Sequence, residues 1–393
     1  MKIVMLCDFY NETLEYQENL LTKYYTKHSH DVTVITSTFE SIFDYYENKH
    51  DKKAPKRVYF DNGAKIIKLP YAWNIFNKLR KYTSIKNILI EEKPDLIYVH
   101  DIMLNILEAR DYLKNNPACK MIMDFHADHS NSANGWLSLN ILHKIIRKKL
   151  YLDPVLPYLS KIFPIVPAST KFLNEVYKVP LNLMDLLPLG ADTDMGKSVK
   201  QKKEGSHIRE FLNIPSTDIV IFSGGKLQKL KKTELLIEAF HKLNCTDVHL
   251  IIIGEAGEKD QDYKQSLLNI ANNHPRIHFI GWLKSIEVYK YLDAADLAVF
   301  PASQSILWQQ AISMGLPLIV GDTGNQSIDY LNEHENIILL GNERISTESI
   351  FIEIHIVIND RAKLNRMKIG AQKVTEKYLT WDNLILKTLQ FNN

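Results

Sequence analysis

The chain of 393 residues is long enough for two domains, each with its own hydrophobic core. Its 48 lysines and arginines against 46 aspartates and glutamates leave a net charge of +2, which argues against a nucleic-acid partner. No apolar run approaches the roughly 20 residues of a membrane-spanning helix, and the three cysteines fit neither a metal motif nor a disulfide framework, so we expect a reducing cytoplasm.

The first segments predict the start of an α/β unit. Lys2–Cys7 is typical of a buried strand, and because Met1 runs directly into it we expect no signal peptide. A helix with apolar spacing over Tyr16–Lys27 and a strand over Asp31–Thr36 follow. This order is half of a doubly wound nucleotide-binding fold. The first loop contains no G-x-G-x-x-G, which disfavours a dinucleotide cofactor.

The polar residues between the first strand and helix have two interpretations. They either meet a ligand at the carboxyl edge of the sheet or form a simple polar turn with a helix cap. We take Tyr16 and Gln17 as acceptor-side candidates on the first interpretation, together with Asp128 and His129 of a later loop. The next stretch, Thr38–Asp61, has no clean period and predicts an excursion from the sheet.

Two basic stretches predict helices at the surface. Asn74–Glu92 carries lysines and an arginine between Lys78 and Lys86, and Ile141–Tyr151 interleaves cations with apolar residues. An ordinary amphipathic surface helix explains either one. The alternative is a patch that rests on anionic lipid, because four cations cluster between Lys144 and Lys149.

Two buried strands end in histidine and aspartate. Pro94–Val99 is followed by His100 and Asp101, and Lys120–Asp124 is followed by a loop containing His126, Asp128 and His129. Parallel strands bring these ends to one sheet edge, where ligands bind in open α/β sheets. A metal site, a polar loop and a substrate-binding histidine all fit, but His126 and His129 on a loop lack the helical spacing of common zinc motifs.

The middle of the chain predicts a junction. Asp192 and Asp194 follow Pro-Leu-Gly, and we interpret them as turn chemistry rather than as a metal site. Lys197–Gly205 is polar and lysine-rich and predicts a linker.

A second α/β unit begins with the strand Asp218–Phe222. The following loop contains Gly225, Lys226 and Lys231 before the helix Thr233–Leu243. Two cations beside free backbone N–H groups suit a diphosphate, although they also fit a solvated helix start.

The stretch Pro301–Asp322 predicts a loop, a helix from Ile306, a glycine stop and a buried strand. We expect Ser305 to cap the helix, with Ser303 beside it at the loop entrance. The free N–H groups of such a helix would provide a phosphate seat.

Several motifs in order resemble the retaining glycosyltransferases of GT-B architecture, family four. They span about Leu187 to Gly324 and comprise LPLGAD at Leu187–Asp192, the Gly-Lys-Leu element of Ser223–Ile237, Ile277–Gly281, YLDAAD at Tyr291–Asp296 and QAISMGLPLI at Gln310–Ile319.

The resemblance implies a residue set for donor binding and chemistry. Lys226, Lys231 and the helix start at Ser305 would neutralise the leaving diphosphate, and His126 would contact the donor sugar. The two family glutamates are absent: Gln310 takes the ribose position, and Gln304 is the nearest candidate for the sugar position. Gly225 and Trp282 complete the donor set. Such transfer needs no metal and no cofactor beyond the nucleoside-diphosphate sugar.

We therefore predict an α/β protein of GT-B fold, with two Rossmann-like domains facing across a cleft. The predicted boundaries are residues 1–195 for the acceptor domain, 206–371 for the nucleotide-sugar domain, and 372–393 for a helix that crosses back. The predicted function is a glycosyltransferase that moves a sugar from a UDP- or GDP-sugar to a saccharide or lipid-linked acceptor in bacterial surface-polysaccharide synthesis. We expect it in the cytoplasm, on the inner face of the membrane. A non-catalytic saccharide-binding relative and a sugar-nucleotide epimerase remain alternatives.

Overall fold

In a computed structural model, the described residues are 1–13, 16–41, 45, 54–75, 78–129, 131–132, 135–302, 304–324 and 328–390. They form two compact units. Unit 1 contains Met1–Pro188 together with the residues from Leu384 onward, and unit 2 contains Leu189–Asn383. Among the described helices, none is both long enough and apolar enough to span a bilayer.

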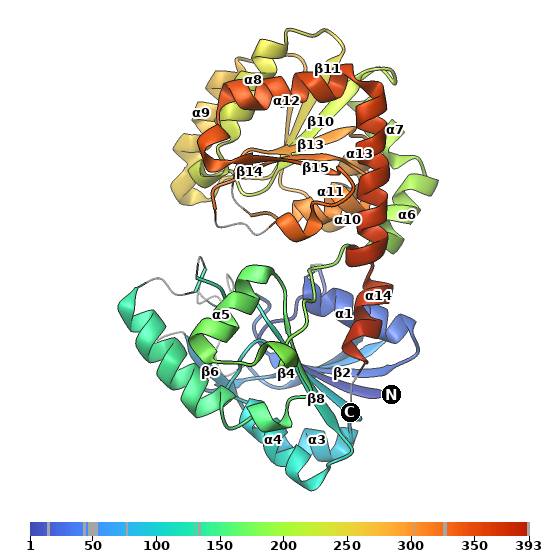
Figure 1. Cartoon of the computed structure of the whole chain (residues 1–393). Helices are drawn as coiled ribbons and strands as arrows, with labels where there is room; N and C mark the ends of the chain where they lie inside the picture. Colours follow the sequence, from blue (N-terminus) through green and yellow to red (C-terminus); the bar gives the residue numbers. More distant parts are fainter. Residues whose placement is uncertain are drawn as a thin grey trace. The chain divides into compact units, whose positions relative to one another are not determined.

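Unit 1 is built on a seven-stranded sheet in the order β3-β4-β2-β1-β7-β8-β9 (Figure 1). Every neighbouring pair is parallel except β3 with β4. Without the antiparallel edge strand β3, the order in chain sequence is 3-2-1-4-5-6, which is the doubly wound order that the sequence predicts. The strands are β1 (Lys2–Leu6), β2 (Asp31–Ser37), β3 (Arg57–Asp61), β4 (Ala64–Leu69), β7 (Leu96–His100), β8 (Lys120–Phe125) and β9 (Lys161–Pro164).

The central strands β1, β7 and β8 of unit 1 are buried almost end to end, because helices cover both faces of a parallel sheet. The helices of this unit are α1 (Gln17–Lys27), α3 (Lys86–Glu92), α4 (Ile106–Asn115), η1 (Ser138–Leu152) and α5 (Pro167–Tyr177).

Unit 2 has a fully parallel six-stranded sheet in the order β12-β11-β10-β13-β14-β15, which is again 3-2-1-4-5-6 in chain order. Its strands are β10 (Ile219–Gly224), β11 (Val248–Ile253), β12 (Ile277–Gly281), β13 (Leu297–Phe300), β14 (Leu318–Asp322) and β15 (Ile337–Gly341). Its helices are α6 (Thr193–Gln201), α7 (Glu204–Phe211), α8 (Thr233–Leu243), α9 (Gln261–Ala271), α10 (Ser285–Asp293), α11 (Leu307–Ser313), α12 (Thr347–Asn359) and α13 (Arg361–Val374).

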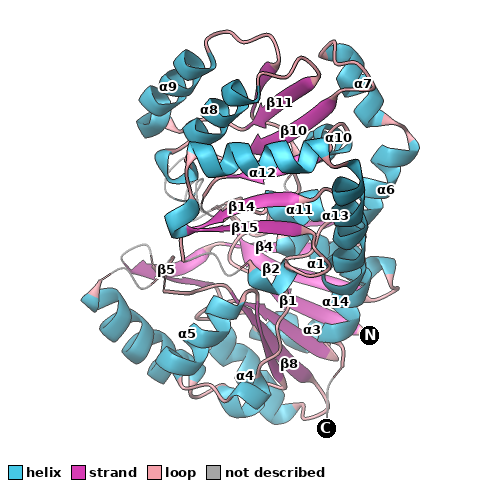
Figure 2. Cartoon of the chain, turned by 45° about the horizontal axis from the view of Figure 1, so that its top comes forward, coloured by secondary structure: helices cyan, strands magenta, loops and turns pink. Residues whose placement is uncertain are grey.

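The alternation of side chains along β10 separates two cores in unit 2. Ile219 and Ile221 pack with residues of α8, α9 and α12, whereas Val220 and Phe222 pack with residues of α10, α11 and α13. Figure 2 shows these two groups of helices on opposite sides of the sheet. The fold predicted from the sequence, with two Rossmann-like sheets, is therefore confirmed.

The predicted linker at Lys197–Gly205 is wrong, because α6 and α7 occupy this stretch. Lysine-rich composition misleads here because the residues that hold these two helices in place lie far along the chain. Lys200 donates to the Met314 carbonyl at 2.9 Å, and a Cβ on Gly205 would lie 2.5 Å from the Asp293 backbone, so α7 packs very tightly.

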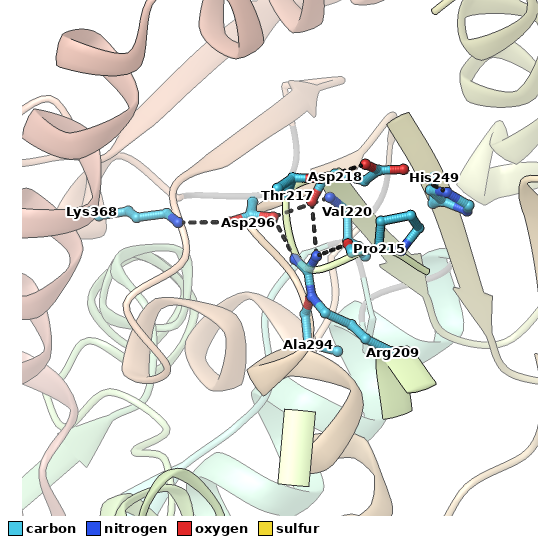
Figure 3. A network of polar contacts seen from close by, with 9 residues as sticks. All are labelled: Arg209, Pro215, Thr217, Asp218, Val220, His249, Ala294, Asp296 and Lys368. Atoms are coloured by element: carbon cyan, nitrogen blue, oxygen red, sulfur yellow. Dashed lines mark hydrogen bonds and ion pairs between the residues drawn. The ribbon is translucent and has the colours of Figure 1, made fainter. Parts of the chain in front are cut away.

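Arg209 fixes α7 to the unit 2 sheet through the network in Figure 3. Its guanidinium donates to Asp296 at 2.7 Å and to the carbonyls of Ala294 and Asp218 at 2.9 and 2.8 Å. Lys368 on α13 donates to the other Asp296 oxygen at 2.9 Å. Burial would raise the pKa of Asp296, but Lys368 and Arg209 outweigh it and keep the pKa below its usual value.

The predicted basic helix over Asn74–Glu92 is also wrong in its first half. Antiparallel strands β5 (Tyr71–Ile75) and β6 (Leu79–Tyr82) form a small sheet there, and only α3 is helical. The cations of this stretch are used inside unit 1. Arg80 pairs with Asp8 at 2.6 Å, and Lys81 pairs with Glu108 at 2.9 Å. Much of the positive charge predicted to face lipid is thus neutralised.

The last helix, α14 (Trp381–Thr388), follows η8 (Thr375–Leu379), and its end belongs to unit 1. Lys387 pairs with Asp185 at 2.8 Å and donates to the Leu186 carbonyl at 2.6 Å. Thr388 is hydrogen-bonded to Tyr25 of α1. Much of the predicted excursion at Thr38–Asp61, and also Ser303, lies outside the described residues; the excursion's end is β3.

Candidate functional site

The first group of candidate residues lies where β10 ends. β10 and β13 are the neighbouring central strands at which the strand order reverses, and ligands of doubly wound sheets bind at this carboxyl edge. Gly225 follows β10 with φ 118°, a conformation open to glycine, and its N–H donates to the Ile253 carbonyl at 3.1 Å. A Cβ on Gly254 would lie 1.9 Å from the Gly225 carbonyl oxygen, so the two loops require glycine to approach this closely.

Lys231 lies directly beside Gly225. A Cβ on Gly225 would be 3.6 Å from Cε of Lys231 and 3.7 Å from Oγ of Ser305, so three residues predicted from the sequence come together. The Lys231 ammonium donates to the backbone carbonyl of Gln304 at 2.6 Å. We call this group, Gly225, Lys231, Gln304 and Ser305, the β10 corner.

The charge of Lys231 is not balanced by a carboxylate among the described residues. Burial lowers its pKa to about 8, and no acidic group contributes to the shift. A half-buried ammonium that meets only a carbonyl gains strongly from a bound anion, because charge-assisted bonds to phosphate replace the lost hydration. The β10 corner therefore has the chemistry of an anion site.

Lys226 and Trp282 lie apart from the corner. The Lys226 ammonium is 3.6 Å from the Asp260 carboxylate, and a Cβ on Gly257 would meet it at 3.3 Å, so Lys226 turns toward the loop after β11. Trp282 follows β12, the edge strand of the sheet, and its side chain is exposed.

The helix after the corner begins where the sequence predicts, within one residue of Ile306. α11 starts at Leu307 and has only 7 residues. Ser305 lies one residue before the capping position, Ile306, and its hydroxyl accepts only a long bond of 3.4 Å from the Leu307 N–H. The predicted serine cap is therefore wrong, since Ser305 Oγ lies instead near Gly225. On α11 the amide oxygen of Gln310 is buried and has no hydrogen-bond partner among the described residues.

The second group lies in unit 1, where β7 and β8 end side by side. Register pairs His100 with Asp124. The fully buried Asp124 accepts from His100 Nδ1 at 2.8 Å, from the Tyr98 hydroxyl at 2.9 Å and from the Asp101 N–H at 2.9 Å. Asp101 has φ 60°, an uncommon backbone conformation that places its N–H on this carboxylate.

His126 and Glu18 complete this group, which we call the His–Asp cluster. His126 Nε2 is buried and lies 3.4 Å from the Asp124 carboxylate, within ion-pair distance. The His100 and His126 rings lie 4.5 Å apart, and Glu18 on α1 is 3.9 Å from His100 Nε2.

Electrostatics tie the cluster together. Burial lowers the pKa of His100, but Asp124 and Glu18 outweigh it and raise the pKa to about 9. Burial would raise the pKa of Asp124, yet His100 and His126 hold it well below its usual range. Burial raises the pKa of Glu18.

The donor set of the His–Asp cluster bears on metal binding. One ligand atom from each of His100, Asp124 and His126 lies within 4.8 Å of the others, a spacing that can hold a divalent cation. Asp124 already receives three hydrogen bonds from protein groups, so most of its roughly four acceptor positions serve to orient its neighbours.

The remaining sequence candidates in unit 1 have other surroundings. Gln17 is buried beside Glu18, and neither of its amide atoms has a partner with hydrogen-bonding geometry in the described part of the chain. Tyr16 precedes α1 and is exposed. Asp128 accepts from the Asn131 N–H at 3.0 Å within its own loop, and His129 lies 3.5 Å from Glu175, away from the cluster.

The sequence interpretation missed Glu18 and the joining roles of His100 and Asp124. The positions of His100 and Asp124 at strand ends predicted their place at the sheet edge. No local pattern predicts Glu18, which lies on α1 and contacts His100 from there. Only the topology, which places α1 after the central strand β1, supplies it.

Comparisons with known proteins agree with this fold. The family model described as Glycosyl transferases group 1 matches residues 206–374, which contain the β10 corner. The solved structure of Anabaena Alr3699/HepE, in complex with UDP and glucose, superposes with a TM-score of 0.66 at 16% identity over 99% of each chain. A glycosyltransferase from Rickettsia africae gives a TM-score of 0.68 at 12% identity over 99% of this chain and 96% of its own.

WaaG, a glycosyltransferase involved in lipopolysaccharide biosynthesis, gives a TM-score of 0.60 at 14% identity over 98% of each chain. None of the curated proteins matches the sequence. Residues 206–374 thus match the Glycosyl transferases group 1 family, and the whole chain has the GT-B fold of two Rossmann-like domains.

Proposed function

We propose that the protein is a glycosyltransferase that moves a sugar from a UDP- or GDP-sugar to a saccharide or lipid-linked acceptor in bacterial surface-polysaccharide synthesis. The observation that carries the proposal is the β10 corner, where Lys231 lies unpaired with any described carboxylate beside Gly225 at the strand-order switch. The family match over the same residues and a UDP complex on the same fold support it.

The proposed chemistry is transfer with retention and without a metal or other cofactor. The bond from the anomeric carbon to the diphosphate oxygen breaks, and a bond from that carbon to the acceptor oxygen forms on the same face. The acceptor's proton passes to the departing diphosphate, so no enzymic base is required. Lys231 stabilises the charge that develops on the leaving group, with Lys226 as a second, more exposed cation.

We further propose that Gln310 binds the donor ribose and that Gln304 approaches the transferred sugar. The unpartnered, buried oxygen of Gln310 supports its role, because a ribose hydroxyl would satisfy it. His126 would contact the sugar with its exposed ring edge, while Asp124 holds the other edge. The acceptor-side candidates are Tyr16 and Gln17, which precede Glu18 of the His–Asp cluster, and Asp128 and His129, which follow His126.

The test is isothermal titration of UDP and GDP into the wild type, Lys231→Ala and Lys229→Ala. Lys229 belongs to the same turn but is exposed, so it is the matched control for loss of one positive charge. We expect binding of one diphosphate that is weakened in Lys231→Ala and retained in Lys229→Ala. Equal affinity for all three proteins would remove the β10 corner from the proposal.

Turnover separates the transferase from its two rivals. Release of UDP or GDP from a matching sugar nucleotide in the presence of acceptor supports transfer. Epimerisation of the free sugar nucleotide would identify an epimerase, and tight binding without any turnover would identify a non-catalytic relative. The non-catalytic alternative is included because glutamines replace the two motif glutamates, and an amide lacks the charge assistance of a carboxylate.

A further inference from the structure

A stripe of large apolar side chains is exposed along one side of η1 and the turn before it. Its members are each between 40% and 70% exposed. They are Trp136, Leu137, Ile141, Ile145 and Leu150. η1 is a π-helix, whose backbone hydrogen bonds join residues five apart, so Leu137, Ile141, Ile145 and Leu150, which are spaced four or five residues apart, follow one face. We call this set the η1 stripe.

The opposite face of η1 is fixed to unit 1. His143 is buried, its Nδ1 lies 2.7 Å from the Tyr177 hydroxyl, and its Nε2 lies 3.0 Å from the Ser132 carbonyl. The ring also meets Phe172 of α5 edge-on at 5.2 Å. The helix is therefore held firmly by one face, and the exposure of the stripe does not come from a loosely attached segment.

Positive charge accompanies the stripe. From Asn131 to Leu152 the sequence contains four cations, Lys144, Arg147, Lys148 and Lys149, and no aspartate or glutamate. Lys148 is paired with Asp153 at 2.8 Å. The other three have no carboxylate partner in the described ranges, and Lys144 and Lys149 are exposed.

A second exposed apolar pair, on α12, lies on a helix of opposite charge and therefore separates the effect of charge from that of apolar exposure. Ile352 and Ile356 on α12 are also four residues apart and are 44% and 43% exposed. Their helix carries Glu348 and Glu353 and no lysine or arginine. An anionic surface would repel α12 and attract η1, so apolar exposure without cations serves as the control.

We propose that the η1 stripe docks on an anionic lipid bilayer, with the apolar side chains entering the interface and Lys144 and Lys149 meeting the headgroups. An exposed apolar face flanked by lysines, with a tryptophan at one end, suits the boundary between acyl chains and headgroups. A single helix with four or five such side chains lies in the interface and does not cross the membrane. The inference rests on this surface alone and holds whether or not the protein is a transferase.

The experiment measures co-sedimentation of the full chain with vesicles of phosphatidylcholine alone or mixed with phosphatidylglycerol. The wild type is compared with Ile141→Ser/Ile145→Ser, with Lys144→Gln/Lys149→Gln, and with the matched control Ile352→Ser/Ile356→Ser. Circular dichroism and thermal melts establish that each variant is folded.

We expect the wild type and the α12 control to bind the anionic vesicles alike. Each lysine near the surface strengthens binding about fivefold, so the lysine pair variant should bind about 25-fold more weakly, and binding should fall with added salt. The isoleucine pair variant should lose about tenfold or more. Quenching of Trp136 by brominated lipid, lost in Trp136→Phe, should report insertion.

Other outcomes overturn the proposal. Equal binding to neutral and anionic vesicles would remove the charge argument, and equal binding of the isoleucine variant and the wild type would remove the stripe. A wild-type dimer in sedimentation velocity that Ile141→Ser/Ile145→Ser converts to a monomer, with no vesicle binding, would show instead that a second copy covers the stripe.

Discussion

Binding of a nucleoside diphosphate should depend on pH through Lys231. Because burial lowers the pKa of this ammonium to about 8, about nine tenths of the protein molecules carry the charge at pH 7 and about one tenth at pH 9. If only the charged form holds the diphosphate, the dissociation constant should rise about tenfold between these pH values, equivalent to about 1.4 kcal/mol. A bound diphosphate favours the ammonium, so at pH 8 binding should take up about half a proton.

Two substitutions at Lys231 separate charge from size. Lys231→Ala should weaken binding at pH 7 by about 1.5–3 kcal/mol, the range for a charge-assisted bond, and its deficit relative to the wild type should shrink by pH 9. Lys231→Arg keeps a charge at every pH tested and should flatten the pH dependence.

The assay is isothermal titration of UDP at pH 7, 8 and 9 in pairs of buffers that differ in ionisation enthalpy, which yields both affinity and proton uptake. Titration of the nucleotide itself is common to all variants and cancels in their differences. A wild-type affinity that changes in parallel with that of Lys231→Arg, or an Ala deficit that stays constant from pH 7 to 9, would refute the reasoning.

Three further predictions follow from other contacts. Gln310→Ala should lose affinity for the nucleotide donor in a titration while its melting temperature stays that of the wild type. Gln310→Glu should keep or improve this affinity, because a carboxylate is a stronger acceptor. A folded Gln310→Ala variant that binds the donor normally would contradict the ribose role. His100→Asn should lower the free energy of unfolding by about 3 kcal/mol at pH 7, because the fold raises the pKa of His100 from 6.5 to about 9. This stabilisation is complete below pH 6.5 and is lost as the pH rises through about 9. Urea unfolding that gives the same deficit at pH 7 and pH 10 would contradict the prediction. Arg209→Ala should destabilise unit 2 by about 1.5–3 kcal/mol in urea unfolding, because it removes charge-assisted hydrogen bonds to Asp296 while Lys368 stays paired with that carboxylate. Glu210→Ala on the exposed side of α7 should change little.

Local patterns were enough to predict the fold. The apolar runs at Lys2–Cys7, Pro94–Val99 and Asp218–Phe222 are all buried parallel strands, as their composition indicates. The same local reasoning failed at Lys197–Gly205, because lysines on an exposed helical face look like a linker when their anchors lie far along the chain. It failed at Asn74–Glu92 because a hairpin whose cations are paired with Asp8 and Glu108 has the charge pattern of a basic helix.

The sequence by itself determined the two doubly wound sheets and the identity of the residues at their carboxyl edges, since strand burial, glycine positions and loop charges are properties of neighbouring residues. Only the tertiary structure decided which of those residues meet. It placed Lys231 beside Gly225 and Ser305 and turned Lys226 toward Asp260. It also joined Glu18 to His100 and Asp124 and left the η1 stripe exposed. The physical reason is that the pairing, burial and pKa of a side chain depend on groups that the strand order brings in from distant segments. The spacing of residues along the sequence does not give the distances between those groups in space.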